Sequence, residues 1–463
     1  MKSTTSAADI AKAVNARETS ARNVVVAAMA RIEVNNGRLG AFTDTLTSRA
    51  MAKADAVDTA VQAGKKLPLA GVPFGVKNLF DVKGLVTRAG SKINRENAAA
   101  ATDATLIQKL EAAGAICVGA LNMGEYAYDF TGENAHDGPS RNPHDLTHMS
   151  GGSSGGSASA VAGGLVPLAL CSDTNGSIRV PASLSGLFGL KPTYGRLSRH
   201  GTFPFVSSLD HVGPLARSVE DLALCYDAMQ GFDEADPAMH KRPLEAVAGR
   251  LERAAAGLRV AIADGYFAGD AEPREVMDQV AKALEVTRRI TIPDAQAARS
   301  AAFLITMAEG ASLHLDRLRT RPQDFDADVR DRLLAGALLP AAWIERAQKF
   351  RRAYRERMLE LFNDVDVILA PSTPMRAPRL GQKTAMLGGV EQPIRPNLGI
   401  FTQPISFIGL PVAAVPIWLK TYKLPLGIQV ITAPWREDNA LRVARQLEKA
   451  GIASAPVARG FAD

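Results

Sequence analysis

Residues 150–157 read Ser-Gly-Gly-Ser-Ser-Gly-Gly-Ser, and an alanine-rich apolar stretch, residues 158–170, follows at once. A flexible linker lies between polar regions, so this apolar flank argues against a linker. A phosphate-binding loop is disfavoured, because the run lacks both the Lys-Ser/Thr ending of a P-loop and the Gly-x-Gly-x-x-Gly register. The remaining interpretation is a catalytic loop, in which glycines let the backbone approach a substrate closely.

A second motif supports that interpretation. Residues 171–181 read Cys-Ser-Asp-Thr-Asn-Gly-Ser-Ile-Arg-Val-Pro. A serine after an Asn-Gly pair lies on a tight turn, where successive backbone N–H groups can converge on one oxygen and form an oxyanion hole. Taken alone, such a turn is more often found on a surface. The apolar stretch before it and Arg179 after it weaken the surface interpretation.

A serine nucleophile needs a base, which is usually histidine. His144, His148 and His211 lie near this region, but none has a glycine-rich or apolar setting, and a structural role is favoured for His211. Lys77 instead ends the apolar run 69–76. Desolvation there would lower its pKa and let the neutral amine accept a proton. A lysine that reaches solvent is an equally good interpretation of the local sequence.

Composition sets outer limits on the function. The chain has 463 residues, a formal net charge of +6, 46% hydrophobic residues and 22% charged residues, which excludes wholesale disorder. The charge does not choose among nucleic acid, a membrane surface and an anionic substrate. Cys117, Cys171 and Cys225 are widely spaced, with no metal-site or disulfide pattern, so we expect reduced core residues.

Two features bear on location. Residues 1–8 lack the apolar core of a secretory signal, and the longest apolar stretch, residues 161–171, contains glycine and proline and is too short for a membrane span. We therefore expect a soluble cytoplasmic protein that does not associate with membranes.

The order of apolar patterns predicts α/β layering. Residues 1–60 form helices, residues 61–235 alternate strands and helices, residues 236–363 are mostly helical after a surface connection over 236–256, and residues 364–463 return to strands and end in a helix. Six Arg or Lys residues lie between Glu345 and Arg357, interleaved with Phe350 and Tyr354. A nucleic-acid surface is conceivable there, but an amphipathic helix with a solvated basic face is favoured.

Together these motifs resemble the amidase signature family. The resemblance rests on Gly75-Val76-Lys77, the run around Ser153 and residues 173–179; Ser153 comes 76 positions after Lys77, and Ser177 comes 24 positions after Ser153. It extends over nearly the whole chain. It implies a single α/β domain, residues 1–463, with a mixed central sheet covered by helices on both faces and a catalytic core at residues 61–235.

The resemblance also implies a mechanism. In this family a Ser-cisSer-Lys triad, here Ser177, Ser153 and Lys77, hydrolyses amides through an acyl-enzyme, without a metal or cofactor, and Ser153 follows a cis peptide bond. Backbone N–H groups of Thr174, Asn175, Gly176 and Ser177 would form the oxyanion hole. Most members have glycine where this chain has Asn175, which indicates a subgroup.

Further stretches resemble a subgroup from bacterial cyanuric-acid breakdown. They are residues 121–123, 126–128, 141–145, 197–199, 313–316 and 321–325. This resemblance implies ammonia release from a small carboxylated urea or biuret-type amide, and a small helical accessory subunit in a heterotetramer, with a homodimer as the other assembly. The substrate carboxylate needs a cation, for which Arg317, Arg319 and Arg321 are candidates.

Two other functions stay open. One is the glutaminase subunit of an aminoacyl-tRNA amidotransferase, which shares the triad. The other is a non-catalytic phosphate- or nucleotide-binding protein that uses residues 150–157.

Overall fold

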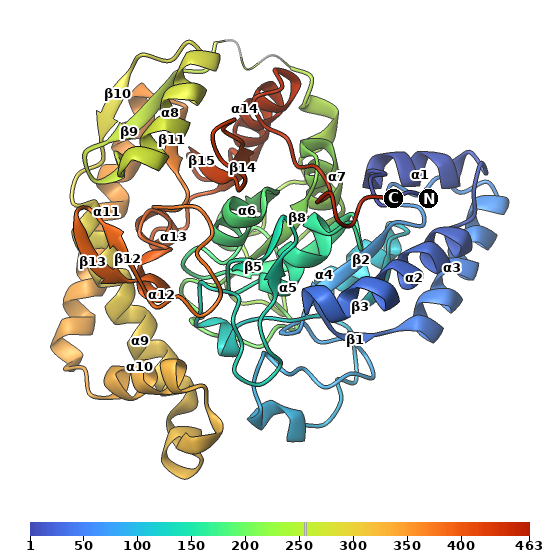
Figure 1. The fold of residues 1–463 in the computed structure, drawn as a ribbon, viewed down its shortest axis with the longest axis horizontal. Helices are drawn as coiled ribbons and strands as arrows, with labels where there is room; N and C mark the ends of the chain where they lie inside the picture. The colour runs from blue at the N-terminus through green and yellow to red at the C-terminus, as the bar shows by residue number, and fades with distance from the viewer. Residues whose placement is uncertain (254, 256) are drawn as a thin grey trace.

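The computed structural model describes residues 1–253, 255 and 257–463, and its elements are arranged around one mixed sheet of eleven strands (Figure 1). The strands in spatial order are β1 (Phe42–Thr45), β3 (Ile116–Leu121), β2 (Pro73–Lys77), β6 (Leu168–Asp173), β8 (His211–Ala216), β7 (Phe188–Lys191), β14 (Val412–Ile417), β15 (Leu426–Thr432), β11 (Val367–Pro371), β9 (Val260–Asp264) and β10 (Arg289–Thr291). Strands β3, β2 and β6 run parallel, as do β11, β9 and β10, and the other neighbours are antiparallel.

The connections of the parallel strands place helices on both faces of the sheet. From β2 the chain passes through α4 (Thr105–Ala112) to β3, and from β3 through α5 (Gly155–Ala162) to β6. These crossovers run in opposite directions along the sheet, so two right-handed crossovers put α4 and α5 on opposite faces. The predicted α/β fold with a mixed, covered sheet is therefore confirmed.

Each face carries a group of helices. Helix α5 contacts α6 (Arg179–Ser185), and α6 packs on β14 and β15, whereas α7 (Val219–Met229) contacts both α4 and α14 (Glu437–Lys449). The N-terminal helices are α1 (Ala7–Asn15), α2 (Ala21–Leu39) and α3 (Thr47–Gln62), and α8 (Ala271–Ala283) packs on β11 and β15. Two small hairpins, β4 (Arg141–Asn142) with β5 (Asp145–Met149) and β12 (Thr384–Leu387) with β13 (Val390–Pro393), stand outside the sheet.

Strands from all four predicted segments join this sheet. Segment 236–363 supplies β9 and β10 as well as the long helices α9 (Ala295–Thr320), α10 (Ala327–Ala337) and α11 (Ala341–Asp364). The expected connection over 236–256 includes residues 254 and 256, which lie outside the described residues; its described part contains a short 3-10 turn, Ala248–Arg250. The division of the chain into these segments remains a prediction.

The serine-glycine run is only partly a loop. Ser154 precedes the first turn of α5, and Gly155, Gly156 and Ser157 are helical, so the second half of the run opens a helix. Every residue of α5 is buried. The second half of the run is therefore a buried helical segment and not a flexible loop.

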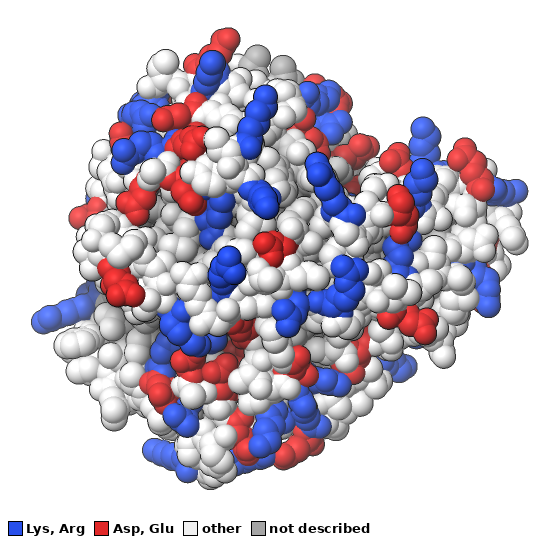
Figure 2. Space-filling view, in the orientation of Figure 1, with Lys and Arg blue, Asp and Glu red and all other residues white. Residues whose placement is uncertain are grey.

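The basic helix α11 packs as an amphipathic helix. Tyr354 is fully buried, and Phe350 and Tyr354 both contact Phe407, at ring centroid distances of 6.4 and 6.2 Å. Figure 2 shows that cationic and anionic side chains are interspersed over the displayed face of the molecule. The excess positive charge is thus not gathered into one patch on that face.

Three further observations concern the predictions from composition. All three cysteines are free and buried, and burial raises the pKa of each thiol. Within the described part of the chain, no helix has the length and apolar character needed to cross a bilayer. No cluster of three or more His, Cys, Asp or Glu side chains is arranged to hold a metal ion among these same residues.

The packing of α5 generates the first prediction. A Cβ at Gly156 would lie 2.4 Å from the Ala41 carbonyl oxygen and 2.5 Å from the Asn122 backbone nitrogen. Gly156→Ala should therefore destabilise the fold, although alanine is normally the better helix former by about 1 kcal/mol. Chemical denaturation measures the change. As a matched control, Gly37→Ala in α2 has open space around the new methyl group and should stabilise the protein. Equal effects of the two substitutions would contradict the packing described.

Candidate active site

Lys77 is buried at the end of β2. Its Nζ lies 2.7 Å from Ser153 Oγ and 2.9 Å from Ser172 Oγ, and its side chain is fully inaccessible. Burial lowers the pKa of the Lys77 ammonium to about 8, although Asp173, Asp210 and Asp129 act in the opposite direction. The neutral amine is therefore a minor but accessible form at neutral pH, and the interpretation of Lys77 as a solvent-reaching lysine is wrong.

Ser153 is held rigidly beside this lysine. The peptide bond between Gly152 and Ser153 is cis, and the Ser153 carbonyl accepts a hydrogen bond from the Gly124 N–H. A Cβ at Gly152 would lie 2.4 Å from a carboxylate oxygen of Asp129, so only glycine fits there. Ser172, on the neighbouring strand β6, was not singled out from the sequence, although it stands beside Asp173 in the second motif.

The turn 174–178 is anchored at both ends by one buried ion pair. Asp173, at the end of β6, accepts hydrogen bonds from the Ile178 N–H at 3.1 Å and from Arg179 Nε and Nη2 at 3.0 and 2.9 Å. Arg179 also donates to the Thr402 carbonyl and to Gln429 Oε1. This pairing holds the pKa of the Asp173 carboxyl well below its usual range, despite complete burial.

Side chains fix the middle of the turn. Thr174 Oγ1 donates to Asp210 at 2.6 Å, Asn175 Nδ2 donates to Thr306 Oγ1 at 2.9 Å, and Thr402 Oγ1 donates to the Asn175 carbonyl at 2.7 Å. In the described part of the chain, no acceptor is hydrogen-bonded to the backbone N–H groups of residues 174–177. Such consecutive free N–H groups are the geometry expected of an oxyanion hole.

Gly176 makes this turn possible. Its φ of +145° is accessible to glycine, and a Cβ at this position would lie 2.2 Å from Thr402 Oγ1. A side chain at residue 176 would therefore displace Thr402, which holds the Asn175 carbonyl.

Ser177, Thr174 and Asn175 line one small cavity. Its volume is about 20 Å³, enough for about one water molecule, so a substrate of several heavy atoms requires lining side chains to move. The other lining residues come from five further parts of the chain: Ala127, Tyr128, Asp129, Phe130, Phe205, Phe303, Thr306, Arg332, Pro396 and Gln403.

None of the three arginines proposed to bind the substrate carboxylate lines this cavity. Arg317 stacks against Tyr126 and Phe203, at 5.9 and 5.7 Å from their ring centroids. Arg319 is largely exposed, and Arg321 pairs with Glu96 and Asp324 at 2.6 and 2.8 Å. The guanidinium of Arg317 is thus stacked on aromatic rings, that of Arg319 is solvated, and that of Arg321 is ion-paired.

Arg332, on α10, is the cation in the cavity wall. Its guanidinium lies 3.7 Å from the Tyr128 ring centroid and donates to the carbonyls of Tyr128 and Asp328. Among the described residues, no carboxylate forms an ion pair with it. The neighbouring Asp129 carboxylate is occupied by N–H groups of Thr131 and Gly132. Local sequence could not have distinguished Arg332 from the many other arginines.

The histidines near these motifs do not line the cavity. His211 is buried, with Nδ1 placed 2.6 Å from the Leu209 carbonyl oxygen, and burial holds its pKa well below the usual range. His144 packs edge-on against Trp418, and burial lowers its pKa to about 4. The surroundings of His211 agree with the structural role favoured for it from the sequence.

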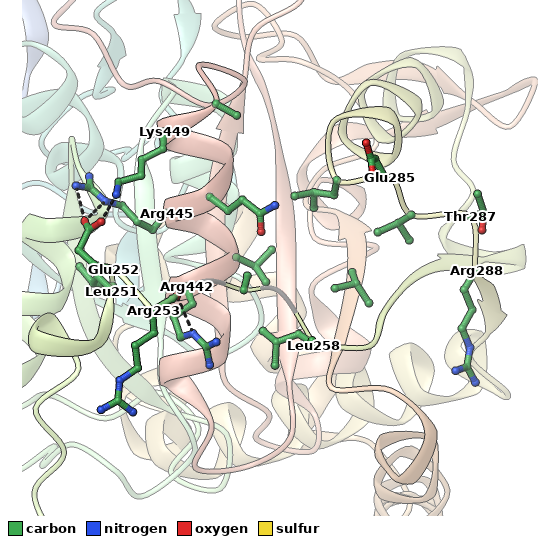
Figure 3. A pocket seen from close by; sticks show the side chains of 18 residues that line it. Leu251, Glu252, Arg253, Leu258, Glu285, Thr287, Arg288, Arg442, Arg445 and Lys449 are labelled. Carbon is green, nitrogen blue, oxygen red and sulfur yellow. Dashed lines mark hydrogen bonds and ion pairs between the residues drawn. The ribbon is translucent and has the colours of Figure 1, made fainter.

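A separate groove of about 820 Å³ lies beside α14 (Figure 3). It is lined by residues from 251–260, 284–288 and 442–450, and Glu252 pairs there with Arg445 and Lys449. It contains none of the predicted site residues. The candidate active site is therefore the smaller cavity at Ser177.

Comparison with known proteins identifies the family. The Amidase family model matches residues 23–441. The chain belongs to the amidase signature family. It is an amide-hydrolysing enzyme, so the non-catalytic phosphate-binding alternative is wrong.

Relatives of this amidase include proteins of two groups. It is 51% identical to AtzE, the 1-carboxybiuret hydrolase subunit of Pseudomonas sp. strain ADP, over 96% of this chain and 98% of that protein. It is 37% identical to a glutamyl-tRNA(Gln) amidotransferase subunit of Azotobacter vinelandii, over 96% of each chain.

Solved amidase structures have a similar fold. One, described as part of a vestigial protein complex that reveals the evolutionary origins of an s-triazine catabolic enzyme, matches with a TM-score of 0.96 and 50% identity over 97% of this chain and all of that one. The corresponding glutamyl-tRNA(Gln) amidotransferase subunit of Thermotoga maritima matches with a TM-score of 0.78 and 30% identity over 95% of each chain.

The anchoring of the turn generates the second prediction. Asp173→Asn leaves the Arg179 charge buried without its carboxylate, so we expect the free energy of unfolding to fall by about 3 to 5 kcal/mol, measured by chemical denaturation. The control is Asp366→Asn, which breaks an exposed pair with Arg259 at 3.0 Å and should cost less than about 1 kcal/mol. Similar losses in both variants would show that burial of the Asp173 pair is unimportant.

Proposed function

We propose that this amidase hydrolyses 1-carboxybiuret, or a closely similar small carboxylated urea, and releases ammonia. The observation that carries the chemistry is the buried 2.7 Å contact between Lys77 Nζ and Ser153 Oγ. The high similarity to a 1-carboxybiuret hydrolase subunit supports the substrate class.

The proposed reaction begins with two proton transfers. Neutral Lys77 takes the proton of Ser153, Ser153 takes that of Ser177, and Ser177 Oγ forms a bond to the carbonyl carbon. The C–N bond then breaks as the proton returns through Ser153 to the leaving nitrogen, so that ammonia departs and an acyl-enzyme remains. Water attacks the ester, and its proton follows the same relay back to Ser177 while the carboxylate product leaves.

The turn 174–177 would stabilise the negative oxygen formed in both steps. Its free backbone N–H groups are held before substrate arrives, because Asp173, Arg179 and Thr402 fix the turn. Each donor in comparable sites contributes roughly 3 to 4 kcal/mol to transition-state stabilisation.

Arg332 would bind the carboxylate of the substrate. It is the cationic side chain among the residues lining the cavity, and no described carboxylate competes for it through an ion pair. We propose this role for Arg332 in place of Arg317, Arg319 and Arg321.

We further propose a small accessory subunit, because the relative is itself one subunit of its enzyme, and because a similar solved structure is described as a protein complex. Co-expression with a candidate small subunit, followed by co-purification and sizing, tests this assembly.

An ammonia-release assay tests the proposed function. We expect turnover of 1-carboxybiuret to exceed that of glutamine. The opposite preference would favour the amidotransferase glutaminase, which the second group of relatives represents. Covalent labelling by a fluorophosphonate, lost in Ser177→Ala, tests the nucleophile.

The titration of Lys77 generates the third prediction. Because the amine must be neutral, kcat/KM should rise with pH through an ionisation near 8 and then level off. Lys77→Ala should lower activity by about 10²-fold or more with the fold intact by circular dichroism, whereas Lys65→Ala, at an exposed site, should leave it unchanged. A flat profile from acidic pH upward would exclude Lys77 as the base.

Carboxylate recognition generates the fourth prediction. Arg332→Gln removes a charge-assisted hydrogen bond of about 1.5 to 3 kcal/mol, so kcat/KM for 1-carboxybiuret should fall by about 10- to 100-fold. Biuret, which lacks the carboxylate, should be affected much less. Arg319→Gln is the matched control at an exposed arginine and should leave kcat/KM unchanged for both substrates. A loss in the Arg319 variant instead would return the role to the α9 arginines.

A further inference from the structure

The side chain of Asn175 leaves one buried polar atom without a partner. Only 6% of the residue is exposed, its Nδ2 donates to Thr306 Oγ1 at 2.9 Å, and no described residue hydrogen-bonds its Oδ1. The residue lines the cavity together with Ser177, which lies two positions further along the same turn. An unpartnered acceptor therefore belongs to a residue that lines the cavity with the candidate nucleophile.

Most other polar groups in the cavity wall are already used. Thr174 Oγ1 donates to Asp210, Gln403 Oε1 accepts from Arg299, and the Asp129 carboxylate accepts from Thr131 and Gly132. The remaining unpartnered buried atom of the lining is the Tyr128 hydroxyl, which can donate; burial raises its pKa to about 12 and keeps it protonated. A ligand that supplies an N–H donor would satisfy Asn175 Oδ1.

We propose that Asn175 determines specificity by accepting a hydrogen bond from an N–H group on the acyl side of the scissile carbonyl. The enzyme would thereby select ureido compounds, in which nitrogen follows the reacting carbon, over carboxamides such as glutamine, in which a methylene group stands there. This inference rests on the proposed function. It explains how enzymes with the same triad select between those two substrate classes.

The cost of leaving a buried acceptor without a hydrogen bond explains why ureido compounds would be preferred. A methylene group in place of the N–H would leave Asn175 Oδ1 buried without a partner, and sites that bury a hydrogen-bonding group discriminate strongly against analogues that lack the complementary group. Thr306, on α9, is a positioning residue, because its hydroxyl engages Nδ2 and so fixes the orientation of the Asn175 amide.

Two substrates isolate this contact. Ureidoacetate and succinamate both carry a terminal carboxamide group and a carboxylate, and they differ by N–H against CH₂ next to the reacting carbon. The measured quantity is the ratio of their kcat/KM values in each variant, because the change in that ratio cancels the intrinsic reactivity of ureas and amides. We expect Asn175→Gly to lower the ureidoacetate-to-succinamate ratio by about tenfold.

The Thr306 variants test the same contact without altering the turn. Thr306→Val should lower the ratio in the same direction, and Thr306→Ser, which keeps the hydroxyl, should retain it. Phe303→Leu changes another lining side chain and should alter both substrates alike. These variants keep the test informative even where Asn175→Gly folds poorly.

The outcomes separate the two proposals. If the wild type hydrolyses both compounds and the ratio changes by less than twofold in Asn175→Gly and Thr306→Val, the specificity role is overturned while the proposed function stands. If the wild type releases ammonia from glutamine but from neither ureidoacetate nor 1-carboxybiuret, the proposed function fails and this inference falls with it.

Discussion

The buried ion pair between Asp173 and Arg179 is the contact on which the site depends. Both side chains are fully inaccessible, so their desolvation is offset only because each carboxylate oxygen and each guanidinium nitrogen finds a partner. The partners come from the turn itself, from β15 and from the segment that begins at Thr402. Three distant parts of the fold thus fix the direction of the backbone N–H groups before a substrate binds, which is the preorganisation that electrostatic catalysis requires.

Burial away from water also sets the pKa of Lys77. Complete burial disfavours its ammonium form, whereas Asp173 and other nearby carboxylates favour it, and the balance lowers its pKa to about 8. A general base works best when its pKa lies near the working pH, so this value would suit Lys77 to the proposed proton transfer. Asp173 therefore acts on both parts of the candidate site, since it anchors the turn 174–178 and limits how far the lysine pKa falls.

The sequence predicted those parts of the fold and site that depend on local pattern. Lys77 at the end of an apolar strand, the glycine at the turn before Ser177 and the return to strands after residue 364 all follow from residues close together in the chain. Contacts between distant segments could not be predicted in this way. Asn175 meets Thr306 across 131 positions, and Arg321 is paired by Glu96 across 225, so one arginine of a cluster that resembles an anion site is already neutralised.

The candidate site combines two sets of elements. Lys77, Ser153 and the turn 174–177 belong to the sheet and the elements beside it, whereas the cavity-lining residues Phe303, Thr306 and Arg332 come from α9 and α10. Changes on these two helices could therefore alter the choice of substrate without disturbing the proposed proton relay. Asn175 is the exception, because it belongs to the turn yet is positioned by α9. A substrate N–H bound to its Oδ1 would also align the adjacent carbonyl with the oxyanion hole, so at this residue recognition and catalysis depend on the same contact.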